Sequence, residues 1–158
     1  MKIPPGVDEG TRIRLPGEGE AGMRGGTPGN LYVFISVKSH KLFHRTEDDI
    51  LLELPINIAQ AVLGAELEAP TLDGPKLLKI PPGTQPGKVM RLRGLGVPHL
   101  RRGGRGDMLV TINVQIPSKL TDEQRDLFNK LGGSLGPASL DKDLDGGFFD
   151  RMKEALGL

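Results

Sequence analysis

The chain has 158 residues, with 21 Lys and Arg against 20 Asp and Glu, no Cys, no Trp and 4% aromatic residues. This length holds one ordinary domain or two small ones. A net charge of +1 gives no field that would make nucleic acid the expected partner. The absence of Cys excludes disulfides, thiolate zinc sites and cysteine nucleophiles, and suits a cytoplasmic protein. No apolar run approaches the roughly 18 residues of a membrane span.

An internal repeat runs through the sequence. The stretch "IPPG" at residues 3–6 returns at residues 80–83, 77 positions later. The same offset aligns many glycines and aliphatic residues, among them Gly10 with Gly87, Gly19 with Gly96, Gly29 with Gly106, Val33 with Val110 and Ile35 with Ile112. Such self-similarity predicts a duplicated structural unit. The segment 43–79, which precedes the second copy, has no counterpart before the first, so we expect the first unit to be truncated at its start.

Two strands are predicted in the first unit, at residues 12–15 and 31–37, because apolar residues alternate with polar ones or share one face. The glycine pattern of residues 17–22 between them matches a nucleotide-binding motif by letter. Two glutamates in it would repel a pyrophosphate, and no helix is predicted to follow. We therefore predict a loop.

The following segment predicts a strand at 50–54, a helix at 56–63 that stops at Gly64, and strands at 66–69 and 77–80 on either side of an Asp73-Gly74 turn. Asp48-Asp49 is either a metal or acid–base pair or a solvated strand edge, and we favour the edge. Strands at 89–92 and 108–114 repeat those of the first unit. The stretch "RRGGRGD" between them suggests a nucleic-acid arm or an adhesion tripeptide, but its place in the repeat favours a hairpin connection.

The C-terminal region changes character and predicts two helices. Thr121 and Gln124 form a capping box, and Gly132-Gly133 should end the first helix. The second helix carries an apolar stripe that comprises Phe148, Phe149, Met152, Ala155 and Leu156. These apolar faces either pack onto their own domain or mediate self-association.

No catalytic constellation is recognisable in the chain. The three histidines, His40, His44 and His99, lack metal-ligand spacing, and no Ser or Thr lies in a nucleophile context. The strand pattern predicts an all-β protein of sandwich or partly open barrel type. Because no catalytic constellation is recognisable, we expect that it is not an enzyme. One candidate is a tandem β-sandwich binding module for carbohydrate or adhesion. The absence of Trp and the single Tyr argue against a carbohydrate platform.

Longer stretches carry a family resemblance. The sequences "KIPPGVDEGTRIRLPGEGEAG", "DDILLELPINIAQAVLGAELEAPTLDG" and "GRGDMLVTINVQIPSKLTDEQ" resemble the C-terminal substrate-binding region of the DnaJ family, the bacterial Hsp40 co-chaperones. The tail "GGFFDRMKEALGL" is similar to the C-terminus of bacterial members. The resemblance covers essentially the whole chain. In the family, Asp-Gly is usual near Thr46-Glu47, so we expect a small change at that turn.

This resemblance implies two tandem β-sandwich-like subdomains, at 1–41 and 42–117, followed by a helical dimerisation element at 118–158. It implies a homodimer that binds unfolded or partly folded clients, prevents their aggregation and presents them to Hsp70, without a membrane or nucleic acid. The chain contains no His-Pro-Asp and no Cys-x-x-Cys. We therefore expect no stimulation of Hsp70 ATP hydrolysis and no cofactor here, with zinc only in the full-length protein.

The resemblance also implies client-binding residues. Phe43 in "HKLFHR" matches a Phe that lines the family's client groove, and its neighbour Leu42 is expected to assist. Tyr32 and Phe34 share one face of the predicted strand 31–37, and are either an exposed apolar patch for clients or core beneath strands that the first unit lacks. Ile13 and Leu15 should lie on an uncovered apolar face that clients contact.

Overall fold

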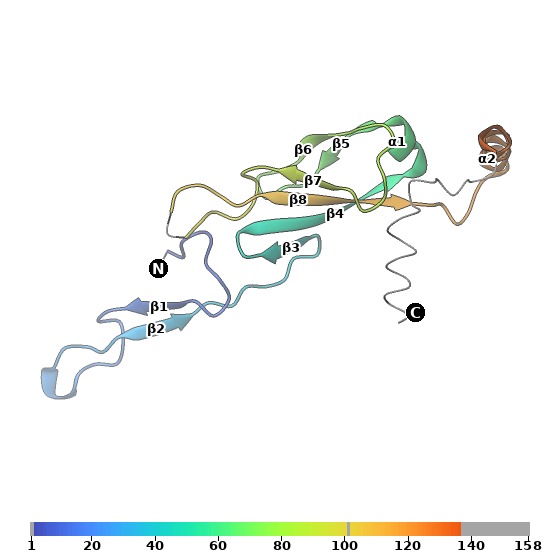
Figure 1. Ribbon diagram of the computed structural model, residues 1–158. Coiled ribbons are helices and arrows are strands. Elements are labelled where there is room, and N and C mark those ends of the chain that lie inside the picture. The colour runs from blue at the N-terminus through green and yellow to red at the C-terminus, as the bar shows by residue number, and fades with distance from the viewer. Residues whose placement is uncertain (1, 101, 137–158) are drawn as a thin grey trace, which may run out of the picture. The chain divides into compact units, whose positions relative to one another are not determined.

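A computed structural model describes residues 2–100 and 102–136 of the chain. The chain divides between Ile116 and Pro117 into two compact units. The fold is all-β with short helices, as predicted (Figure 1). The elements of the first unit are β1 (Arg12–Leu15), the 3-10 turn Met23–Gly25, β2 (Leu31–Phe34), β3 (Phe43–Thr46), β4 (Asp49–Asn57), α1 (Ile58–Leu63), β5 (Ala65–Ala69), β6 (Lys76–Ile80), β7 (Val89–Leu92) and β8 (Met108–Gln115). The second unit contains α2 (Asp122–Leu135).

The structure confirms the duplication. Strands β1 and β2 pair antiparallel with Arg12 opposite Phe34, and β7 and β8 pair antiparallel with Val89 opposite Thr111. Both residues of the second pair lie 77 positions after those of the first. The loops at residues 16–30 and 93–107 are therefore equivalent hairpin connections, as the repeat predicted.

A β-bulge recurs at the same offset. In the first copy the Ile35 N–H donates to the carbonyl of Thr11 at 2.9 Å, while the Gly10 N–H donates to the Ile35 carbonyl at 2.9 Å. Two residues thus oppose one, which is the definition of a bulge. Ile112 makes the equivalent two bonds with Lys88 and Gly87, each of 2.8 Å. The repeat is thus maintained in individual backbone hydrogen bonds.

The two copies differ in what lies beside the second strand of each. The strands β3-β4-β8-β7 form one sheet in that order, in which β4 and β8 run parallel (Figure 1). The strands β1 and β2 form a sheet of two. One apolar cluster, the core, joins the four-stranded sheet to α1 and the β5–β6 hairpin. It comprises Ile50, Leu52, Leu54, Ile56, Ala61, Ala69, Leu78, Ile80, Val97, Met108, Val110 and Ile112.

The pair Asp48-Asp49 is not a solvated strand edge, because β4 lies between β3 and β8. The Asp48 carboxylate lies 2.6 Å from Nδ1 of His99, and Oδ1 of Asp49 accepts the Asp107 N–H at 2.7 Å. These contacts tie the start of β4 to the β7–β8 connection. Asp107 itself accepts the Gly94 N–H at 2.7 Å, and this bond, with Arg91, lowers the pKa of Asp107 below its usual 3.8.

The turn from β3 to β4 has an unusual backbone. Thr46 pairs with Asp49, so Glu47 and Asp48 form a two-residue connection. Glu47 has a φ of 54°, a conformation that glycine adopts at lower cost. Where the family usually has Asp-Gly, this chain has Thr46-Glu47, and Glu47 is the residue whose backbone conformation favours Gly.

Several element boundaries differ from the predictions. Strand β2 ends at Phe34 rather than Val37, since β1 offers no partner beyond the bulge. Strand β4 continues to Asn57 through Pro55, which is tolerated because β3 pairs only as far as Leu52. Asn57 then caps α1, so that helix begins at Ile58.

The prediction that Gly132-Gly133 ends the first C-terminal helix is wrong. Helix α2 begins at the predicted capping box, in which the Thr121 hydroxyl accepts the Gln124 N–H at 3.2 Å. It then continues through both glycines to Leu135. Gly136, with a φ of 71°, follows it.

Candidate functional site

A pocket of about 710 Å³ lies beside β3 in the first unit. Its lining comes from segments far apart in the sequence: residues 8–9 at the N-terminal turn, 37–40 after β2, 43–45 and 47 in and after β3, Ile50 of β4, and Leu72 in the β5–β6 connection. Apolar walls are supplied by Val37, Phe43, Ile50 and Leu72. Charged residues of both signs also line the pocket: Asp8, Glu9, Lys38, Arg45 and Glu47.

Phe43 lines this pocket and is partly buried. Its ring stacks on the His40 imidazole, with centroids 4.8 Å apart and planes at 22°. It also packs against the core cluster. The His40 Nδ1 accepts the Leu42 N–H at 3.1 Å, which fixes the backbone that enters β3. Phe43 therefore has both a structural role and access to the pocket.

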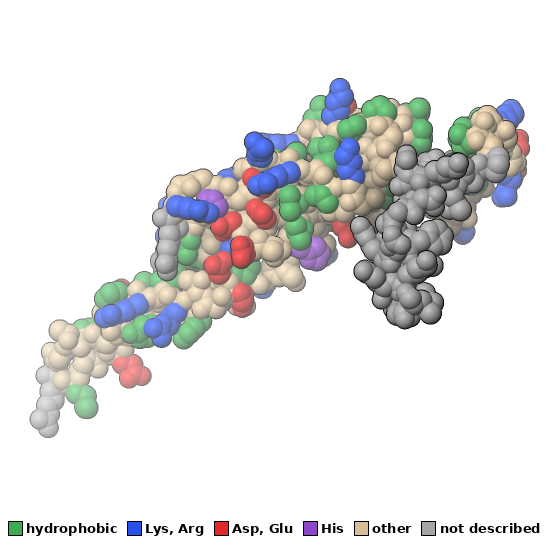
Figure 2. Space-filling model, in the orientation of Figure 1, with side chains coloured by type: hydrophobic (Ala, Val, Ile, Leu, Met, Phe, Trp, Pro, Cys, Tyr) green, Lys and Arg blue, Asp and Glu red, His purple; other side chains and the backbone are tan. Residues whose placement is uncertain are grey.

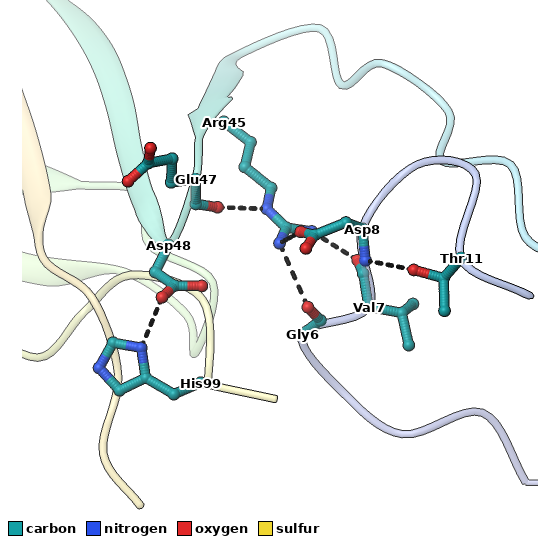
Figure 3. Close-up of polar contacts among 8 residues, drawn as sticks. All are labelled: Gly6, Val7, Asp8, Thr11, Arg45, Glu47, Asp48 and His99. Carbon is teal, nitrogen blue, oxygen red and sulfur yellow. Dashed lines mark hydrogen bonds and ion pairs between the residues drawn. The ribbon is translucent and has the colours of Figure 1, made fainter. Parts of the chain in front are cut away.

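Arg45 holds β3 to the N-terminal turn (Figure 3). Its guanidinium donates to the carbonyl of Val7 at 2.7 Å and to that of Gly6 at 3.2 Å, and it forms an ion pair with Asp8. The Arg45 Nε also donates to the Glu47 carbonyl at 2.6 Å. A planar guanidinium can serve several acceptors at once in this way. The N-terminal turn of the first copy is thus fastened to β3 at the pocket.

Strand β3 offers a second feature at the same place. It is the outermost strand of the four-stranded sheet, paired on one side with β4. Among the described residues no strand pairs with its other side. An edge strand presents unpaired backbone donors and acceptors that an extended chain can use. The pocket and the open edge of β3 therefore lie at the same place in the fold.

The other predicted client residues do not line this pocket. Leu42 is 53% exposed beside it, and Tyr32 and Phe34, at 44% and 70% exposed, lie on one face of the β1–β2 hairpin. The Arg12 guanidinium lies 5.0 Å from the centre of the Tyr32 ring. Ile13 and Leu15 are half-buried on the opposite face. Figure 2 shows hydrophobic side chains beside Lys and Arg over this hairpin.

Two outcomes follow for these candidates. Tyr32 and Phe34 are exposed among the described residues, and the alternative that placed them in a core beneath strands that the first unit lacks stays a prediction. Sequence reasoning singled out Phe43 but missed His40 and Arg45, whose contacts hold it in place. The signal was present, because both belong to the same "HKLFHR" stretch.

The predicted dimerisation residues Phe148, Phe149, Met152, Ala155 and Leu156 lie outside the described residues. Helix α2, which is described, buries none of its side chains. It carries an exposed apolar stripe, the α2 stripe, that comprises Leu127, Phe128, Leu131 and Leu135. These residues recur at helical spacing on one face.

The described ranges 2–100 and 102–136 lack two further features. No group of three or more His, Cys, Asp or Glu side chains there is arranged to hold a metal ion. No helix in that part of the chain combines the length and apolar character needed to cross a bilayer.

Comparisons with known proteins agree on one family. A family model described as "DnaJ C terminal domain" matches residues 1–117. The chaperone protein DnaJ of Roseiflexus sp. (strain RS-1) is 55% identical over 158 residues, which cover all of this chain and 43% of that protein. The DnaJ proteins of Roseiflexus castenholzii and Brevibacillus choshinensis are 52% and 50% identical, with 43% and 42% of each covered. The chain thus spans less than half the length of these relatives.

Proposed function

Since this chain belongs to the family of DnaJ C-terminal domains, we propose that it is the client-binding part of a DnaJ-type co-chaperone. Its role is to hold unfolded or partly folded polypeptides in the cytoplasm, to prevent their aggregation and to present them to Hsp70. The role involves binding rather than catalysis. We further propose that residues 1–41 and 42–117 act as two subdomains and 118–158 as a dimerisation element.

The observation that carries client binding is the apolar pocket beside the open edge of β3. A client segment that extends β3 would form backbone hydrogen bonds independent of its sequence. One of its apolar side chains would enter the pocket between Val37 and Phe43. A volume of about 710 Å³ lies within the usual range for ligand pockets. This combination suits a protein that must accept many sequences.

The carbohydrate alternative has little support at this site. The only tyrosine of the chain, Tyr32, lies close to the Arg12 guanidinium on the hairpin rather than in the pocket. The pocket wall offers Phe43 and two imidazoles, without the open aromatic platform that sugar rings stack on. Apolar side chains of a polypeptide match the pocket better.

Client capture is tested by changing the pocket wall. Phe43→Ala should weaken binding of an unfolded test protein about tenfold, or about 1.4 kcal/mol, because an apolar contact is lost. Since Phe43 also packs on the core, Val37→Glu provides a second variant that places a charge in the pocket without altering the core. The measurement is suppression of aggregation of a chemically denatured enzyme, together with affinity by fluorescence anisotropy.

Leu77→Ala is the matched control, because Leu77 is an exposed apolar residue on β6 that does not line the pocket. It should leave aggregation suppression unchanged. Thermal unfolding of Val37→Glu should match the parent chain. Full chaperone activity in both pocket variants would contradict a client site at this place.

The α2 stripe supports the proposed dimer. Burying a Leu side chain contributes roughly 1.5 to 3 kcal/mol. In a two-fold symmetric dimer each residue is buried in both subunits, so its contribution to the dimerisation free energy is doubled. Leu131→Glu should therefore raise the dimer dissociation constant at least about a hundredfold. Asn129→Glu adds the same charge outside the α2 stripe and should leave the dimer intact. Sedimentation equilibrium of both variants decides the matter, and equal masses would show that α2 packs on its own chain.

A further inference from the structure

Leu72 reaches the pocket beside β3 from the connection between β5 and β6. The hairpin that carries it is anchored at its base, because Ala69 and Leu78 belong to the core. Leu72 itself is 43% exposed, so packing alone does not fix its side chain. Its place at the pocket depends on the turn in which it lies, and therefore on the contacts that hold this turn.

The turn has weak bonds of its own. The Gly74 N–H donates to the Thr71 carbonyl at 3.2 Å, and the Asp73 N–H donates to the Thr71 hydroxyl at 3.3 Å. Both distances are at the long end of the range for good hydrogen bonds. Thr71 is buried, so the start of the turn is fixed. Leu72 and Asp73 project beyond it and need support from outside the hairpin.

Arg105 supplies that support from the β7–β8 connection. One terminal N–H of its guanidinium donates to Oδ2 of Asp73 at 2.7 Å, and its Nε donates to the Gly96 carbonyl at 2.9 Å. Its backbone forms a bridge with Pro98. A planar guanidinium with several donors can join two acceptors on different segments in this way. The residue next to Leu72 is thus tied to a second loop.

That second loop is a firm anchor. The Gly96 N–H donates to the Gly106 carbonyl at 2.8 Å, and the Val97 N–H donates to the Asp48 carbonyl at 2.8 Å. A Cβ at Gly96 would lie 2.4 Å from the same Asp48 oxygen, so the backbones are in close contact. The Gly96 carbonyl that receives Arg105 is therefore held by the start of β4, which also carries part of the pocket wall.

We propose that Arg105 is a positioning residue of the client pocket, which acts through Asp73 to hold Leu72 against the bound apolar side chain. This inference rests on the proposed function, because it concerns the same pocket. It assigns a role to the Arg of the "RRGGRGD" stretch, which does not line the pocket itself. The β7–β8 connection thereby influences how tightly clients bind.

The probe is reduced and carboxymethylated α-lactalbumin, which stays unfolded without denaturant. Fluorescein-labelled probe is titrated with the full chain, and binding is followed by anisotropy. Arg105→Met keeps a long apolar stem but removes the charge. The ion pair is partly exposed, at 29% and 47% for its two side chains. We therefore expect a loss of affinity of about threefold, the size typical of such pairs.

Three further variants separate positioning from a general effect on stability. Asp73→Ala breaks the same contact from the other side and leaves the bond from Arg105 to Gly96, so it should match Arg105→Met. Arg105→Lys keeps a cation near Asp73 and should restore binding to within about twofold of the parent chain. Arg102→Met removes the same charge from an exposed residue of the same connection and should have no effect.

A double-mutant cycle identifies the side chain through which Arg105 acts. Leu72→Ala should weaken binding about fivefold, because a partly buried apolar contact with the client is lost. In that background Arg105→Met should cause no further loss, since residues that act through one another are not additive. Methyl NMR spectra of Arg105→Met should show changed Leu72 signals and unchanged Ile112 signals.

Opposite results would overturn the inference. These are unaltered affinity in both Arg105→Met and Asp73→Ala, an equal loss with and without Leu72→Ala, or unchanged Leu72 methyl signals. The proposed function is judged separately by Val37→Glu. If that variant loses binding while Arg105→Met is neutral, the client pocket stands and the role of Arg105 is rejected. If Val37→Glu is also neutral, the client pocket is rejected and the role of Arg105 with it.

Discussion

Replacing Ile112 by Ala is expected to lower the free energy of unfolding by about 3 to 4 kcal/mol, because a fully buried side chain would leave a cavity. Ile112 is 0% exposed in the core, between β7 and β4. The repeat supplies its own control, since Ile35 is the same residue type in the same backbone environment but only half-buried. Ile35→Ala should cost about 1 kcal/mol or less.

Denaturant unfolding of the parent chain and both variants measures the two losses. The same asymmetry should appear in amide exchange, with β1 and β2 exchanging before β7 and β8. Losses of similar size at Ile35 and Ile112 would contradict the unequal burial of the two copies. Equal protection of the two hairpins would do the same.

A Gly106→Ala substitution is expected to be still more damaging. A Cβ at Gly106 would lie 2.0 Å from the Asp48 carbonyl oxygen and 2.8 Å from Oδ1 of Asp49. That carbonyl cannot move freely, because it accepts the Val97 N–H at 2.8 Å. Relief of the clash therefore requires the start of β4 to separate from the β7–β8 connection. We expect a loss of about 4 kcal/mol or more, at the upper end for single substitutions.

Gly29→Ala is the matched control, because Gly29 holds the equivalent position in the first copy. Its nearest neighbour for an added Cβ is the Glu20 carbonyl at 3.7 Å, an ordinary contact. The change should cost less than about 1 kcal/mol. Thermal unfolding followed by circular dichroism compares the two, and a tolerated Gly106→Ala would mean that β4 starts differently.

The sequence predicted strands where apolar alternation and the repeat agreed, and it missed β3 for a physical reason. In "FHRT" the inward position after Phe43 is taken by Arg45, a residue that alternation treats as polar. Its place is stabilised by the carbonyls of Gly6 and Val7, nearly forty residues away. The local alternation of polar and apolar residues cannot predict a contact between residues so far apart in the sequence.

Helix α2 shows a similar limit at its end. Glycine costs a helix about 1 kcal/mol relative to Ala, so Gly132-Gly133 looked like a stop. The helix nevertheless passes through both, and Gly136 takes the positive φ that follows the last turn. Helix propensity identifies Gly132, Gly133 and Gly136 as candidate helix ends, but it does not tell which of the three ends the helix.

The candidate site was predictable only in part. The family motif pointed to Phe43, but the pocket also needs Val37, Asp8 and Leu72, which no spacing in the sequence connects. The aligned glycines and aliphatic residues located the second copy of each hairpin. They did not show that β4 covers one copy and that no described strand covers the other.

The parallel pairing of β4 with β8 has a consequence for biosynthesis. Ile50 pairs with Met108, 58 residues later, whereas β3–β4 and β5–β6 are local hairpins that close quickly. At about 5 to 20 residues per second, a ribosome takes about 3 to 12 s to make the intervening chain. During that interval the aliphatic face of β4 has no β8 to cover it. The nascent polypeptide then exposes the aliphatic side chains of an unpaired strand, so the unfinished chain is prone to aggregate through β4.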